Sequence, residues 1–64
     1  MNMLKAKIVE FGETQADLAN LLGIALSNLS LRITGKVDFR SSEIRAIKEH
    51  YHLSPEDVCA IFFN

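Results

Sequence analysis

The chain has a single cysteine, a single proline, three glycines and no tryptophan among its 64 residues. One cysteine permits neither an internal disulfide nor a cysteine-based metal cluster, so we expect Cys59 to be a small buried hydrophobe. With so little proline and glycine, no linker divides the chain, and no internal repeat is found. We therefore expect one domain, residues 1–64, that needs no cofactor.

Long apolar runs and a dominant sign of charge are also missing. No apolar run approaches the roughly 20 residues of a membrane helix, and the N-terminus lacks a signal-peptide core, so we expect a cytoplasmic protein. Apolar residues make up 48% of the chain and charged residues 23%, which is typical of a globular domain.

The residues that enzymes need are not grouped in this sequence. There is no Gly-rich phosphate loop or nucleotide fingerprint. His50 and His52 are two residues apart, so on a helix they face different directions and complete neither a metal site nor a catalytic triad. We expect both to be surface residues at a helix end, and the protein not to be an enzyme.

The most informative stretch is residues 14–36, TQADLANLLGIALSNLSLRITGK. Thr14 followed by Asp17 is a capping box that predicts a helix start, and Gly23 predicts its end. A second helix follows and ends at Gly35. Apolar residues recur at helical spacing in both, namely Leu18, Ala19, Leu22, Leu29 and Ile33. This is the layout of a helix-turn-helix, whose second helix faces a DNA groove.

Three more helices are predicted, about 2–11, 41–51 and 55–63. The first has an apolar stripe and ends at Gly12. Ser41 or Ser42 can cap the second, in which Glu43 is expected to point outward. Ser54, followed by proline at the first helical position, caps the third. The sequence therefore predicts an all-α fold of five helices.

Several of these residues carry a family resemblance. They are Thr14-Gln15, Leu18-Ala19, Gly23-Ile24, Ser27, Leu29-Ser30 and Gly35-Lys36. The run resembles the helix-turn-helix of the phage repressor/Cro (XRE-like) family, and most of all the small Cro-like regulators of temperate phages. The resemblance implies a compact five-helix lambda-repressor-like DNA-binding domain in which the third helix enters the major groove of an operator.

The outward face of the predicted recognition helix carries the candidate base contacts. At about 100° per residue, Leu29 and Ile33 point to the core and leave an uncharged opposite face. The candidates on and beside that face are Leu26, Ser27, Asn28, Ser30 and Leu31. Leucine contacts thymine methyl groups and serine bonds to several base edges, so direct readout is weakly coded and indirect readout gains weight.

Five other residues are candidates for gripping the DNA backbone. Gln15 matches the family's phosphate-contacting glutamine at a helix N-terminus, although an exposed glutamine with no role is the alternative. Thr34 stands where the family often has a phosphate-binding asparagine, and Lys36 and Arg40 lie in the loop that follows. Arg32 flanks the helix and either reaches DNA or covers the edge of the core.

Charge and the C-terminus bear on the oligomeric state. A net charge of −1 is low for a DNA-binding protein, although the segment 26–40 has a local positive excess. A second protomer would add contacts. Ile61, Phe62 and Phe63 cannot all face one core, so we expect an isologous homodimer contact there that spaces two recognition helices about 34 Å apart. Ordinary capping of the core is the alternative.

A second class of function stays open. The outward leucines and the low charge also suit an antirepressor, a protein-interaction module that binds another regulator through its apolar recognition helix and its Phe tail.

Overall fold

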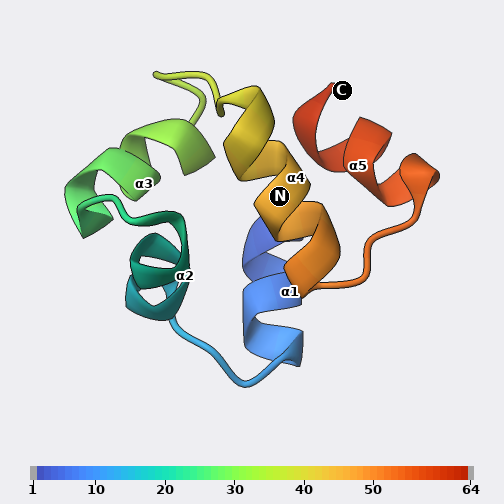
Figure 1. Ribbon diagram of the computed structural model, residues 1–64, viewed down its shortest axis with the longest axis horizontal. Coiled ribbons are helices and arrows are strands. Elements are labelled where there is room, and N and C mark those ends of the chain that lie inside the picture. Colours follow the sequence, from blue (N-terminus) through green and yellow to red (C-terminus); the bar gives the residue numbers. More distant parts are fainter. Residues whose placement is uncertain (1, 64) are drawn as a thin grey trace.

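The computed structural model describes residues 2–63, which form helices and no strand (Figure 1). The helices within this range are α1 (Met3–Glu10), α2 (Gln15–Leu22), α3 (Leu26–Ile33), α4 (Ser41–His50) and α5 (Pro55–Phe62). The predicted all-α architecture of five helices is confirmed. None of the described helices is long and apolar enough to cross a membrane.

The predicted start and end of α2 and the predicted start of α5 are confirmed. The N–H of Thr14 donates to Asp17 Oδ2 (2.8 Å), and the N–H of Asp17 donates to Thr14 Oγ1 (3.2 Å), which completes the capping box of α2. Gly23 ends α2 with a left-handed φ of +69°, a conformation that costs glycine little. Ser54 caps α5 by accepting the N–H of Asp57. These local signals set the helix boundaries.

The start of α4 differs from the prediction. Ser41 and Ser42 lie in its first turn, and the N-cap position belongs to Arg40. The cap is made from inside the helix, because the Glu43 carboxylate accepts the N–H of Arg40 at 2.8 Å. A carboxylate in the first turn also faces the positive end of the helix dipole. The side-chain bond at this helix start is therefore made by Glu43 to the N–H of the N-cap residue, and the expected serine cap is not formed.

The core is formed by apolar side chains from four helices and the segment before α5. Leu29 is fully buried, and Ile33 is buried beside it, which confirms the predicted register of α3. Ala19 is buried in α2, the helix that packs against α3. The buried apolar residues are Leu4, Ile8, Leu18, Ala19, Leu29, Ile33, Ile47, Tyr51 and Leu53.

Cys59 does not join this core. The cysteine is exposed, contrary to the expectation of a buried side chain. In α5, Val58, Ile61 and Phe62 pack against the core, and Cys59 is rotated about 100° around the helix from Val58. The helix therefore turns Cys59 to solvent.

Candidate nucleic-acid interface

Helices α2 and α3 lie together on one side of the molecule, away from α5 (Figure 1). A short turn, residues 23–25, joins them, and the N–H of Ile24 donates back to the carbonyl of Ala19 at 3.0 Å. Burial of Leu29 and Ile33 fixes the rotation of α3 about its own axis. The side chains on its other faces are thereby held toward solvent.

The five predicted base-contacting residues are exposed on α3. Leu26 is 48% exposed and Leu31 is 40% exposed. Ser27, Asn28 and Ser30 are exposed as well. All five side chains are therefore accessible to solvent, and none of them carries a charge.

The N-terminus of α3 adds hydrogen-bond donors to this surface. Its N-cap residue, Ala25, has no side-chain oxygen and makes no capping bond. The N–H groups of the first turn therefore have no capping acceptor, and the positive end of the helix dipole faces outward beside Leu26 and Ser27. An exposed, uncapped helix start of this kind favours contact with anionic groups.

The predicted backbone contacts differ in how available they are. Lys36 and Arg40 are exposed in the loop between α3 and α4, and Gln15 is half-buried at the first position of α2. Thr34 is exposed, but its hydroxyl donates to the carbonyls of Ser30 (3.0 Å) and Leu31 (3.2 Å). A phosphate oxygen only accepts hydrogen bonds, so the Thr34 hydroxyl must give up these internal bonds before it can donate to DNA.

Arg32 does not face the predicted DNA side. Its Nε donates to Glu43 Oε1 at 3.0 Å and its Nη1 donates to the carbonyl of Asn28 at 3.1 Å. The side chains of Arg32 and Glu43 are only 10% and 8% exposed. Arg32 is held there by Glu43, which was expected to point outward but turns inward and accepts the N–H of Arg40 at the start of α4. A buried carboxylate requires a charged partner, and Arg32 is that partner. We therefore remove Arg32 from the candidate DNA contacts.

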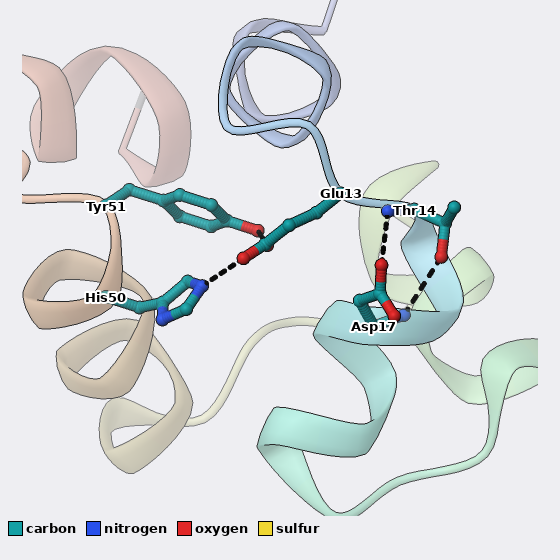
Figure 2. Close-up of polar contacts among 5 residues, drawn as sticks. All are labelled: Glu13, Thr14, Asp17, His50 and Tyr51. Carbon is teal, nitrogen blue, oxygen red and sulfur yellow. Dashed lines mark hydrogen bonds and ion pairs between the residues drawn. The ribbon is translucent and has the colours of Figure 1, made fainter.

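A polar cluster that the sequence did not reveal holds the start of α2. His50 Nε2 lies 2.7 Å from Glu13 Oε2, and the Tyr51 hydroxyl donates to Glu13 Oε1 at 2.8 Å (Figure 2). These two hydrogen bonds lower the pKa of Glu13. Burial, and then the hydrogen bond to Glu13, raise the pKa of Tyr51. Glu13 immediately precedes Thr14, so the cluster ties the N-terminus of α2 to the end of α4. His50 is thus more than the surface residue we expected.

Asn2 anchors the other end of α3. Its Oδ1 accepts the N–H groups of Leu4 and Lys5, which caps α1, and its Nδ2 donates to the carbonyl of Ile33 at 2.9 Å. One amide thus joins the start of α1 to the last residue of α3. Together with the Arg32–Glu43 pair, it fixes the C-terminal end of α3 relative to its neighbours.

The three predicted dimer residues behave differently from one another. Ile61 and Phe62 pack against the core, and the Phe62 ring meets Phe39 edge to face at 5.1 Å. Phe63 is 68% exposed. All three line an open groove of about 420 Å³ between α5 and the loop after α3, whose other apolar lining residues are Leu4, Ile33, Val37, Phe39 and Ile44. The expectation that at least one of the three is exposed is met by Phe63.

The remaining surface chemistry is modest. Asp38 stands between Lys36 and Arg40 in the loop, so the local positive charge is small. Among residues 2–63, no group of three His, Cys, Asp or Glu side chains could hold a metal ion. Hydrogen-bond donors and apolar contacts, more than net charge, therefore characterise the side of the molecule formed by α2 and α3.

Comparison with known proteins gives a family and little else. Searches of curated proteins and of solved structures found no match to the chain. One family model, described as "Protein of unknown function (DUF739)", matches residues 1–64. Since this match covers the whole sequence, the chain belongs to the DUF739 family.

Proposed function

We propose that this protein is a sequence-specific regulator of transcription that binds double-stranded DNA as a phage repressor/Cro-like helix-turn-helix protein. The observation that carries the proposal is the geometry of α3. Leu29 and Ile33 anchor this helix, while its five candidate base-contacting residues and its uncapped N-terminus are exposed. An anchored, exposed helix behind a glycine turn has the form needed to enter a major groove.

Base reading is assigned to short polar and apolar side chains. The Asn28 amide can both donate to and accept from adenine, and Ser27 and Ser30 can bond to several base edges. Leu26 and Leu31 offer contacts to thymine methyl groups. Because serine and leucine discriminate less sharply than arginine or glutamine, the shape and deformability of the operator contribute to selectivity.

The backbone grip is assigned to both ends of the helix pair. The capping box of α2 uses the N–H groups of Thr14 and Asp17, which leaves those of Gln15 and Ala16 for a phosphate. Lys36 and Arg40 supply the charge, and Thr34 is a weaker candidate because its proton is already shared. The Asp17 carboxylate opposes an incoming phosphate, so affinity per protomer is low.

Dimerisation on the operator compensates for this low affinity. We assign the contact to Phe63 and to the groove that it shares with Ile61 and Phe62. A twofold contact through this surface would present two copies of α3 to successive major grooves about 34 Å apart. Such a dimer would act in the cytoplasm of the host cell by occupying the operator and excluding polymerase or a competing repressor.

An antirepressor is the second candidate function. It is favoured by the exposed leucines of α2 and α3, Leu21, Leu26 and Leu31. An apolar strip on a helix suits a hydrophobic groove on another regulator, and this mode of binding needs no phosphate grip.

The test is binding of the full chain to the duplex that flanks its own gene. Fluorescence anisotropy is measured at two salt concentrations, with a scrambled duplex of equal length as control. Selective binding that weakens with salt is the expected result, because contacts to phosphates release counterions. Absence of binding to both duplexes at low salt, from protein shown to be folded by circular dichroism, would favour the antirepressor.

A further inference from the structure

We propose that Glu43 is a positioning residue for the loop of residues 34–40, which carries Lys36 and Arg40. The inference rests on the proposed function, because it assigns to Glu43 the placement of two proposed phosphate contacts. Glu43 lies in α4, outside the helix pair, and its buried side chain has no direct access to DNA.

The geometry that carries the inference is the double use of one oxygen atom. Glu43 Oε1 accepts the Nε–H of Arg32 at 3.0 Å and the backbone N–H of Arg40 at 2.8 Å. Arg32 belongs to the last turn of α3, and Arg40 is the last residue before α4. A single carboxylate therefore holds both ends of the loop.

Other backbone hydrogen bonds of the loop fasten its first half to α3. The N–H groups of Lys36 and Val37 donate to the carbonyl of Leu31 at 2.9 and 3.2 Å, which fastens the first half of the loop to α3. In the second half, the Phe39 ring packs on Phe62, the carbonyl of Arg40 accepts the N–H of Ile44 at 3.0 Å, and the N–H of Arg40 donates to Glu43. Loss of the bond to Glu43 removes the link from Arg40 to Arg32 and so loosens the placement of Arg40 relative to Lys36.

Burial makes the arrangement sensitive to the charge of Glu43. The side chains of Arg32 and Glu43 are only 10% and 8% exposed, so each charge is stabilised by the other and not by water. Glu43→Gln keeps a carbonyl oxygen as an acceptor but weakens both bonds, because it removes the charge. Glu43→Ala removes the acceptor altogether. The two variants therefore grade the loss of the contact.

The first arm of the test uses the full chain and the duplex that flanks its own gene. Glu43→Ala should weaken binding about tenfold, because the order that this charged hydrogen bond gives the loop would then have to form on binding, and Glu43→Gln should weaken it less. In a protein that already carries Lys36→Ala and Arg40→Ala, Glu43→Ala should have under about a twofold effect, because mutations on one pathway are not additive. The matched control, Glu49→Ala, removes an exposed acid from the same helix and should not weaken binding. Equal losses in both backgrounds would overturn the inference, since a general loss of structure does not depend on the loop.

The second arm needs no DNA. Hydrogen exchange of the Arg40 amide in the free protein should speed up about tenfold or more in Glu43→Ala, less in Glu43→Gln, and not at all in Glu49→Ala. Unchanged exchange of the Arg40 amide in a folded Glu43→Ala protein would overturn the role proposed for Glu43 and would leave the proposed function untouched. A wild-type chain that binds no duplex would instead overturn the proposed function, so the two failures are distinguishable. If Glu43→Ala fails to fold, Glu43→Gln carries both arms.

Discussion

Removal of the two exposed cations of the loop gives the sharpest test of the proposed DNA-binding surface. Lys36→Ala combined with Arg40→Ala deletes two positive charges per protomer, or four in a dimer. Each phosphate contact contributes about 0.9 to the slope of log affinity against log salt, so four contribute about 3.6. Between about 50 and 200 mM salt, such a slope corresponds to roughly a 150-fold loss of affinity. The variant should lack most of this salt dependence on any duplex.

The assay is an anisotropy titration at four salt concentrations, with the slope as the measured quantity. The matched control is Arg45→Ala combined with Lys48→Ala, which removes the same charge from exposed positions of α4. Both variants should melt within a few degrees of the wild type, because surface substitutions change stability little. Equal slopes for the wild type and the loop variant would remove Lys36 and Arg40 from the phosphate path. Equal reductions in both variants would mean that only total charge matters.

Five further substitutions probe base reading, the core, the polar cluster and the dimer contact. Leu31→Ala should change the preferred operator sequence in a binding selection while leaving the melting temperature near that of the wild type, because Leu31 is exposed on α3. Leu29→Ala should lower the free energy of unfolding by about 2–5 kcal/mol in urea titrations, and a stable variant would contradict the observed register. Glu13 has a lowered pKa, so its carboxylate stabilises the fold above its ordinary pKa of about 4.3, and this stabilisation is lost as the pH falls through the lower folded value. Glu13→Gln should therefore flatten the acid side of a plot of the free energy of unfolding against pH. Tyr51 has a raised pKa, so its contribution to stability is fully present below about pH 10 and is lost as the pH rises from there toward the higher folded value. Tyr51→Phe should remove that alkaline loss. Phe63→Ser should leave the fold intact but raise the protein concentration at which a dimer forms on DNA, as measured by sedimentation, and an unchanged value would exclude Phe63 from the interface.

The parts of the fold that depend on neighbouring residues could be predicted from the sequence. The capping box of Thr14 and Asp17, the left-handed Gly23 and the cap at Ser54 each act within a few residues, so the residues alone define them. The orientation of Leu29 also follows from helical spacing. These local rules explain why the helix boundaries and the exposed face of α3 could be anticipated.

The parts of the candidate site that depend on residues distant in the sequence could not be predicted in this way. Arg32 and Glu43 are 11 positions apart, and Glu13 and His50 are 37 apart. A long charged side chain can point to solvent or to a partner, and the choice depends on which helix packs beside it. Glu43 was expected outside because helical spacing alone does not show that its carboxylate caps α4 and meets Arg32. Only the assembled helices fix these contacts.

The bond from Asn2 to the end of α3 has a consequence for the chemical ageing of the protein. Deamidation converts asparagine to aspartate, and at residue 2 the new carboxylate would still accept the N–H groups of Leu4 and Lys5. It would, however, place an oxygen opposite the carbonyl of Ile33, where Nδ2 now donates. Helix α1 would keep its cap while α3 would lose its tether. An aged sample could therefore look fully folded by circular dichroism and yet hold α3 less firmly.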